Sequence, residues 1–151
     1  MKKFTLLLLF LSITLYGCKS YSLEGSGKVT DLNIEEVKAF MDDKKTGFLY
    51  VKSAFDSNSD KESDRNNLKE IERVAKDEKI DFYVFDGKEL PESDLYEQDR
   101  SKLIVEQYLK TFAFYQDGEL KAELDLNDVS DEEVHKEVEK FVQKVSQEYS
   151  K

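Results

Sequence analysis

The only cysteine of the chain, Cys18, is the first residue whose position implies chemistry. A lone thiol cannot form an intrachain disulfide. Cys18 follows Gly17 at the end of an apolar run over 4–16, which begins just after two lysines. Positive charge, an apolar segment and small residues at the cut are the marks of a secretory signal. The apolar run is shorter than the roughly 20 residues that a membrane-spanning helix needs.

The segment Leu15-Tyr16-Gly17-Cys18 resembles the lipobox of bacterial lipoproteins, in which an apolar residue and two small residues precede a cysteine. Tyr16 departs from that pattern, because the family usually has a small residue there. The resemblance implies that the thiol of Cys18 is acylated, as in palmitate-bearing lipoproteins, and that Cys18 becomes the new N-terminus. The alternative is an ordinary secretory signal with an incidental cysteine.

An acylated Cys18 would make the membrane a partner of the protein. One acyl chain holds a protein to a bilayer only marginally, whereas two hold it stably, and the resemblance implies a diacylglyceryl anchor. The expected location is therefore extracytoplasmic, lipid-anchored to the bacterial cell membrane. We expect a signal peptide over 1–17, a lipidated flexible tether over 18–28 and one domain over 29–151.

The chain is strongly acidic, which limits its partners. The formal net charge is −10, and it is −12 without the charges of Lys2 and Lys3 in the signal peptide. Nucleic acid requires a basic footprint, so we expect no nucleic-acid partner. Cationic peptides and basic protein faces suit such a charge, although solubility alone also explains it.

An acidic and polar stretch over 56–64 is the strongest candidate for metal binding. Lys61 stands where an EF-hand needs glycine, and Asn67 stands where it needs a bidentate glutamate. We therefore interpret the stretch as a solvated loop and a contact surface, with a calcium site as the alternative. Positions 1, 3, 5 and 9 of such a calcium loop are occupied by Asp56, Asn58, Asp60 and Asp64.

His135 is the only histidine, and the pattern places it on the charged flank of a helix rather than in a cleft. One histidine without further cysteines cannot build a structural zinc site. It also provides no base for a serine nucleophile, and the sequence has no glycine-rich phosphate loop. We expect no catalytic residue, no metal and no cofactor, with an enzyme of unrecognised chemistry as an alternative.

Strand and helix signals alternate along the chain. Asn33 and Glu36 form a capping-box pattern, and the apolar run that starts at Phe48 is typical of a buried central strand. The expected elements are an edge strand at 29–32, a helix at 33–45, a strand at 48–51 that extends at most to Phe55, a helix at 66–78 and a strand at 80–85.

The second half is expected to end in a hairpin and a helix. We interpret 88–100 as a polar loop and the apolar residues around Leu103 and Tyr108 as a short helix. Asp117-Gly118 predicts a two-residue hairpin turn between a strand at 111–116 and one at 119–126. On the second strand, one face is expected to carry Leu120, Ala122, Leu124 and Leu126.

The last helix has the clearest signal. Ser130 and Glu133 form a second capping-box pattern. The apolar stripe that follows consists of Val134, Val138, Phe141, Val142, Val145 and Tyr149. The whole order predicts an α/β domain with one mixed central sheet flanked by helices.

This order resembles the thioredoxin fold over about residues 29–148. The strongest local likeness is 110–120, which is similar to the family's Pro-Thr, apolar strand, glycine turn and next strand. Thioredoxins carry Cys-x-x-Cys after the strand that Phe48 begins, on a helix N-terminus that lowers the thiol pKa. The matching region here, 55–59, has no cysteine, and Lys110 stands in place of the family's cis-proline. The resemblance therefore implies the scaffold without dithiol chemistry.

Within that superfamily the chain is similar to small extracytoplasmic thioredoxin-like proteins, some of them called bacteriocin transport accessory proteins. We therefore expect a redox-inactive accessory module that binds a protein or peptide in secretion, folding or a bacteriocin-related process. The alternatives are a calcium-responsive structural lipoprotein and an unrecognised enzyme. The resemblance places the candidate partner-binding residues at the vacated redox surface: Phe55, Asp56, Asn58, Lys110 and Thr111.

Overall fold

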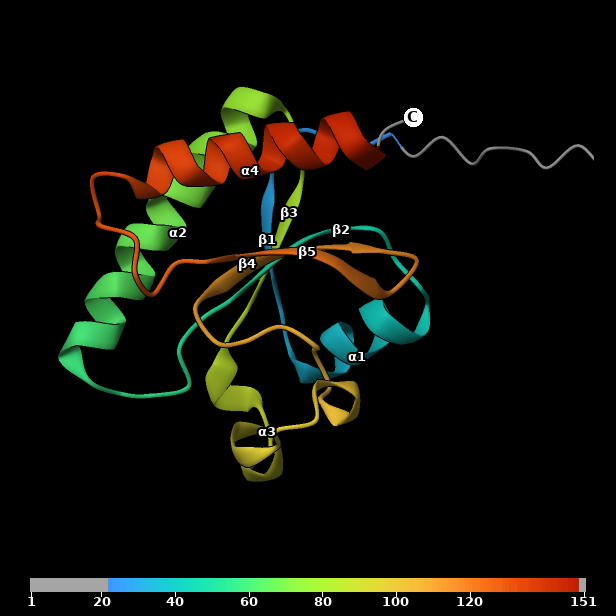
Figure 1. Cartoon of the computed structure of the whole chain (residues 1–151), viewed down its shortest axis with the longest axis vertical. Coiled ribbons are helices and arrows are strands. Elements are labelled where there is room, and N and C mark those ends of the chain that lie inside the picture. Colours follow the sequence, from blue (N-terminus) through green and yellow to red (C-terminus); the bar gives the residue numbers. More distant parts are fainter. Residues whose placement is uncertain (1–21, 150–151) are drawn as a thin grey trace, which may run out of the picture.

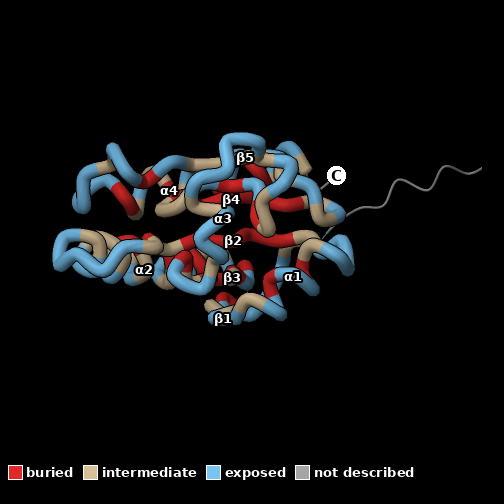
Figure 2. The backbone as a smooth tube through the Cα atoms, turned by 90° about the horizontal axis from the view of Figure 1, so that it is seen from below, coloured by how far each residue is buried: buried red, intermediate tan, exposed pale blue. Residues whose placement is uncertain are grey.

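A computed structural model describes residues 22–149, which form a five-stranded mixed sheet between two layers of helices (Figure 1). The parallel strands are β1 (Val29–Leu32), β3 (Phe82–Phe85) and β2 (Gly47–Val51). Two antiparallel strands, β4 (Thr111–Gln116) and β5 (Glu119–Asp125), continue the sheet beyond β2. The order β1-β3-β2-β4-β5 can be followed in Figure 2. The predicted α/β class with one mixed sheet is confirmed.

The helices divide between the two faces of the sheet. Helices α2 and α4 cover one face, and α1, α3 and the irregular chain between β3 and β4 cover the other (Figure 1). Two single-turn 3₁₀ helices, Gly87–Glu89 and Arg100–Lys102, belong to the irregular part. The helices are α1 (Ile34–Asp42), α2 (Asn58–Glu78), α3 (Glu92–Tyr96) and α4 (Val134–Tyr149).

The alternation of side chains along the strands builds one core on each face. On the α2–α4 face, the ring centroid of Phe48 lies 5.5 Å from that of Phe112 and 5.2 Å from that of Phe82. On the other face, Leu49 and Tyr115 pack against α1. Strands β2 and β4 are buried along almost their whole length, as the red segments in Figure 2 show, which explains their continuous apolar sequences.

Three local signals in the sequence predict the backbone correctly. Asn33 accepts a hydrogen bond from the Glu36 amide, and the Glu36 carboxylate accepts one from the Asn33 amide, each at 2.9 Å. Asp117 and Gly118 have φ values of 53° and 78°, as a type I′ hairpin turn requires. The stripe of α4 is buried at Val134, Val138, Val142 and Val145.

The predicted loop over 56–64 is wrong, because α2 already begins at Asn58. The Ser57 hydroxyl accepts a hydrogen bond from the Asp60 amide at 3.0 Å and caps the helix. The first two turns carry almost no apolar stripe, so periodicity alone misses them. A helical backbone also removes the calcium-loop geometry that the spacing of Asp60 and Asp64 suggested.

The predicted short helix around Leu103 and Tyr108 is also wrong, since 103–107 is a series of bends. Val105 and Gln107 are buried while Glu106 and Tyr108 are exposed, so the segment alternates like an extended chain. The preceding polar segment, 88–100, contains α3 rather than only loop.

Strand β5 carries a bulge that divides its apolar residues between the two faces. Phe114 pairs with Ala122 but Tyr115 pairs with Leu120, so Lys121 is an extra residue. Leu120 therefore packs in the core on the α1 side, and Ala122 and Leu124 pack on the α2–α4 side. The expectation of a single apolar face on this strand is wrong for that reason.

Residues 22–28, which the sequence analysis assigns to a flexible tether, are held against the domain. The Asp81 carboxylate accepts hydrogen bonds from the Ser26 and Lys28 amides, each at 2.8 Å. The Gly25 amide donates to the Lys79 carbonyl at 2.6 Å. These backbone hydrogen bonds lower the pKa of Asp81 below its usual range. Hydrogen bonds thus hold the chain to the domain before β1 begins.

Candidate functional site

The connection from β2 to α2 projects Phe55 into solvent. Its backbone is tied down next to it: the Phe55 amide donates to the Ser53 hydroxyl at 3.1 Å, and the Ser53 amide donates to the Asp64 carboxylate at 3.1 Å. Ser53 itself is buried, whereas Phe55 is 60% exposed. A hydrogen-bonded backbone therefore presents a large apolar side chain that belongs to neither hydrophobic core.

A buried polar network fixes this connection to the first turns of α2. The Tyr50 hydroxyl donates to the Asp64 carboxylate at 2.8 Å and accepts from the Asn67 amide nitrogen at 3.1 Å. Burial raises the pKa of Tyr50 far above its usual value, so the phenol stays protonated and able to donate. The network positions the chain on both sides of Phe55.

Lys110, just before β4, reaches the first turn of α2 with its side chain. It has a φ of 58°, a left-handed conformation that is unfavourable for a residue with a Cβ. Its Nζ lies 3.7 Å from Asp60 Oδ1, and both side chains are largely buried. The chain therefore accepts backbone strain at the position that faces the N-terminus of α2.

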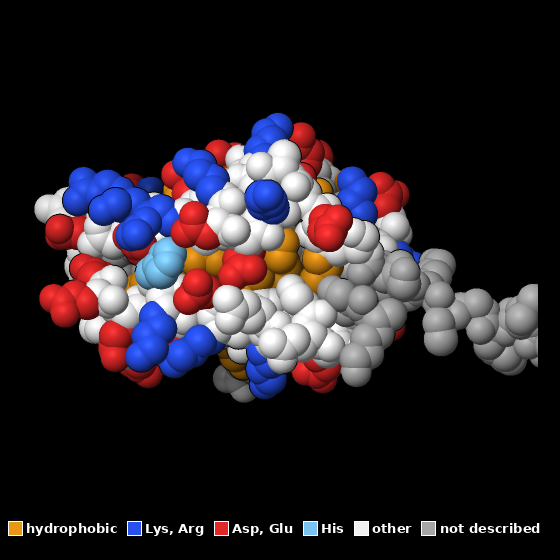
Figure 3. All heavy atoms as spheres, turned by 90° about the horizontal axis from the view of Figure 1, so that it is seen from above, with side chains coloured by type: hydrophobic (Ala, Val, Ile, Leu, Met, Phe, Trp, Pro, Cys, Tyr) orange, Lys and Arg blue, Asp and Glu red, His pale blue; other side chains and the backbone are white. Residues whose placement is uncertain are grey.

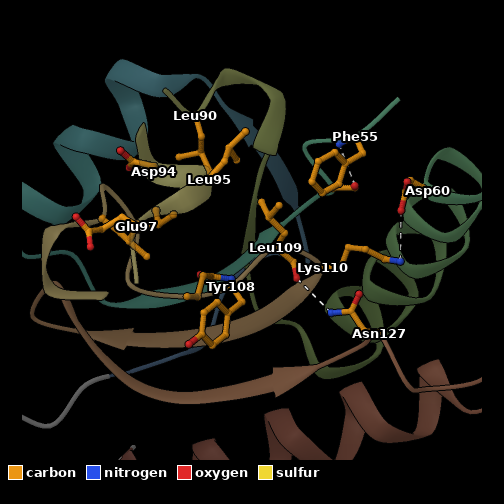
Figure 4. Close-up of a pocket in the computed structure, with 14 residues that line it drawn as sticks. Phe55, Asp60, Leu90, Asp94, Leu95, Glu97, Tyr108, Leu109, Lys110 and Asn127 are labelled. Carbon is orange, nitrogen blue, oxygen red and sulfur yellow. Dashed lines mark hydrogen bonds and ion pairs between the residues drawn. The ribbon is translucent and has the colours of Figure 1, made fainter. Parts of the chain in front are cut away.

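The irregular segment after β3 forms the facing wall. The chain between β3 and β4 contributes four leucines to the lining, with Leu90 and Leu95 in this wall, and the ring of Tyr108 lies at its edge (Figure 4). Arg100 stacks on Tyr108 with 4.1 Å between the guanidinium carbon and the ring centroid. The leucines are Leu90, Leu95, Leu103 and Leu109.

These elements enclose a cavity of about 410 Å³, which we call the Phe55 cavity. Gln107 lies in its lining and is buried, and its amide nitrogen donates to the Leu49 and Thr111 carbonyls at 3.2 and 3.0 Å. Its Oε1 has no hydrogen-bond partner among residues 22–149. Figure 4 shows Phe55, Leu109 and Lys110 on one side of the cavity and Leu90 and Leu95 on the other.

The exposed apolar side chains gather around this cavity. The large hydrophobic residues that are exposed in the described part of the chain are Phe55, Tyr96 and Tyr108. Phe55 and Tyr108 line the cavity, and Tyr96 belongs to α3, which forms its wall. Such a concentration of exposed aromatic side chains marks a surface for a partner more often than chance.

The five predicted partner-binding residues do not all reach the cavity. Phe55 and Lys110 line it. Thr111 is buried beneath it and donates from its hydroxyl to the Tyr108 carbonyl at 2.7 Å. Asp56 turns to the other side of Phe55, where its carboxylate lies 3.0 Å from Lys61 Nζ. Asn58 is exposed at the first turn of α2.

Sequence reasoning missed the wall made by α3 and Tyr108. The segment reads as polar, and its leucines are spaced irregularly, so no periodic pattern indicates them. A signal was present in Pro91 followed by Glu92 and Asp94, because proline and acids favour a helix N-terminus. Pro91 stands at the position before α3.

The opposite face, made by α2 and α4, offers a different surface. Figure 3 shows mixed charges there, with the histidine beside acidic side chains at the line between the two helices. His135 Nδ1 lies 3.2 Å from Glu70 Oε2, and Glu70 also pairs with Arg73 at 2.7 Å. His135 is thus a partly exposed interhelical residue, in agreement with its predicted place on a charged flank.

Two further findings concern only residues 22–149. No cluster of three or more histidine, cysteine or acidic residues is arranged to hold a metal ion. None of the helices has both the length and the hydropathy to cross a membrane. Cys18 and the predicted signal peptide lie outside the described residues.

Comparison with known proteins gives no family for this chain. No protein-family model matches it, and no curated protein matches it. The fold is a small α/β domain with a mixed sheet and is compatible with a thioredoxin-like fold.

Proposed function

We propose that the protein is a lipid-anchored, extracytoplasmic thioredoxin-like protein without redox activity that binds a protein or peptide segment in the Phe55 cavity. Secretion, folding and bacteriocin-related processes are the settings in which such an accessory module would act. One observation carries the proposal: a cavity of about 410 Å³, rimmed by exposed aromatic side chains, lies where the connection after β2 meets Lys110.

The position of the cavity supports the thioredoxin-like interpretation. In that family the redox motif follows the strand equivalent to β2, and substrates are bound between it and the residue before β4. Under the thioredoxin-like interpretation Phe55 and Lys110 correspond to those two positions, and both line the cavity. The chain has one cysteine, so an intrachain dithiol cannot form there. We therefore assign binding, and no catalytic step, to this surface.

The chemistry of the lining suits a peptide side chain. Binding of an apolar group against leucines and aromatic rings is favourable because it removes apolar surface from water. An extended peptide supplies such an apolar side chain.

Site-specific photo-crosslinking in the intact cell tests the proposal. A benzophenone amino acid replaces Phe55 in one strain and Lys144, an exposed residue of α4 on the opposite layer, in the control strain. We expect a discrete crosslinked partner from position 55 and none from position 144. Equal crosslinking from both positions, or none from position 55, would count against a binding role for the cavity.

A further inference from the structure

A second hollow lies on the other side of Phe55, and its charge is opposite to that of the chain. It measures about 280 Å³ and is lined by four cationic side chains, although the sequence has 33 acidic residues against 23 lysines and arginines. We call it the cationic hollow. Phe55 lines both it and the Phe55 cavity. The cations are Lys52, Lys61, Arg65 and Lys88.

Three separate segments bring these cations together. Lys52 follows β2, Lys88 lies in the 3₁₀ turn after β3, and Lys61 and Arg65 lie on the first turns of α2. Lys52 is neutralised by Asp86 at 3.2 Å. The Asp64 carboxylate, which also lines the hollow, already accepts from the Tyr50 hydroxyl and the Ser53 amide.

The remaining two ammonium groups, Lys61 and Lys88, share one carboxylate. Asp56 Oδ1 lies 3.0 Å from Lys61 Nζ and 2.5 Å from Lys88 Nζ. Hydrogen bonds from Lys88 and Lys61 lower the pKa of Asp56 below its usual range. Asp56 is nevertheless 74% exposed, and exposed ion pairs are weak because water competes for them. Its carboxylate is therefore easily displaced by another.

We propose that Lys61 and Lys88 bind a carboxylate of the same ligand whose apolar side chain enters the Phe55 cavity, and that Asp56 occupies this position only in the free protein. The inference rests on the proposed function. Because Phe55 separates the two hollows, the carboxylate and the apolar side chain lie close together in the ligand. The carboxylate is that of an acidic side chain or of the ligand's own C-terminus.

Selection from two random peptide libraries tests this on the full-length chain, purified in mild detergent. One library displays octapeptides with linkers at both ends, and the other displays them with a free C-terminus. We expect an apolar residue with aspartate or glutamate within two positions from the first library, or an apolar residue next to the free carboxylate from the second. Apolar peptides without a nearby carboxylate would overturn the inference alone, and no enrichment at all would overturn the proposed function too.

Variants of the protein then test the role of each charge with the best peptide. Lys61→Gln combined with Lys88→Gln should weaken binding about tenfold. The same change should be seen when the peptide carboxylate becomes an amide, and the two losses should not add. The matched control is Lys121→Gln combined with Lys140→Gln, since these lysines also pair with exposed acids at 2.6 and 2.8 Å. Losses that add, or an equal loss in the control, would overturn the assignment.

Asp56→Asn separates the inference from a structural role of these ion pairs. Because it removes the internal competitor, it should strengthen binding of the acidic peptide about threefold and leave the amide peptide unchanged. A structural role predicts equal or weaker binding of both peptides. Unchanged or weaker binding of the acidic peptide to this variant would overturn the inference.

Discussion

The two faces of the sheet are covered in different ways. Long regular helices, α2 and α4, seal one face, where rings of Phe48, Phe112 and Phe141 lie within 6.2 Å of each other. On the other face, α1 is followed by short turns and the five-residue α3. The Phe55 cavity lies on this second side, at the end of the sheet where β2 ends. Regular helices pack densely onto a sheet, whereas irregular chain leaves space that a ligand can use.

The sealed face should respond most strongly to mutation. Phe112→Ala removes a fully buried ring from among Phe48, Phe82 and Phe141 and should lower the free energy of unfolding by about 3–5 kcal/mol. Phe55→Ala, the same change on the exposed side, should cost about 0.5 kcal/mol or less. Urea unfolding measures both. A comparable loss from Phe55 would show that it belongs to the core.

The floor of the cavity should have an intermediate effect. Gln107→Ala leaves the Thr111 hydroxyl and carbonyl without the amide donor and should cost about 1–3 kcal/mol. Thermal and urea unfolding of the variant give this number. Gln143→Ala, on the exposed side of α4, is the control and should change stability by less than about 0.5 kcal/mol. Equal losses of stability in the two variants would mean that the hydrogen bonds of Gln107 do not stabilise the fold beneath the cavity.

Lys110 should show a conflict between stability and binding. Lys110→Gly and Lys110→Ala both lose the ion pair with Asp60, but only the glycine relieves the left-handed backbone, so its free energy of unfolding should exceed that of the alanine variant by about 1 kcal/mol. Lys110→Gly should also weaken crosslinking from position 55, because the side chain lining the cavity is lost. Lys79→Gly is the matched control, since Lys79 has a φ of 54° at the end of α2, away from the cavity. Lys79→Gly should raise the free energy of unfolding without affecting crosslinking from position 55. A loss of crosslinking in this control would show that the effect of Lys110→Gly does not come from the cavity.

The smallest expected effect is a pH-dependent release of residues 22–28. The folded-state pKa of Asp81 is lowered by backbone hydrogen bonds, so its stabilising effect is present above the unfolded pKa and is lost as pH falls through the folded one. The amide resonances of Ser26 and Lys28 should therefore shift together with a midpoint below 3.8, the ordinary value. Asp81→Asn should show no such transition. A midpoint at or above 3.8 would contradict the role given to Asp81.

Much of the fold was predictable because local chemistry and burial agree in it. The capping box at Asn33, the Asp117-Gly118 turn and the stripe of α4 each have one physical cause that the sequence shows directly. The start of α2 was not predictable from periodicity, because its first turns project into solvent and bury almost nothing. The division of β5 between two faces depends on a bulge, which alternation cannot reveal.

The site was predictable only in part for a related reason. Phe55 and Lys110 adjoin predicted strands, so their positions could be foreseen. Leu90, Leu95 and Tyr108 lie in irregular chain that is held by side-chain hydrogen bonds such as the one from the Ile104 amide to Asp94. Long-range contacts of that kind leave no repeating signal along a sequence.

The fastening of residues 22–28 by Asp81 has a consequence for orientation. Leu23 already packs against the core, so only four residues separate it from Cys18, and the five steps along the chain span roughly 17 Å at most. Ser22 and Leu23 lie near Gly47, where β2 begins, whereas the Phe55 cavity lies beyond Val51, where β2 ends. If Cys18 is lipidated as proposed, the domain stands close against the headgroups with its cavity on the side away from them. A ligand would then reach the cavity from the side that faces away from the membrane, and not by diffusing along the bilayer.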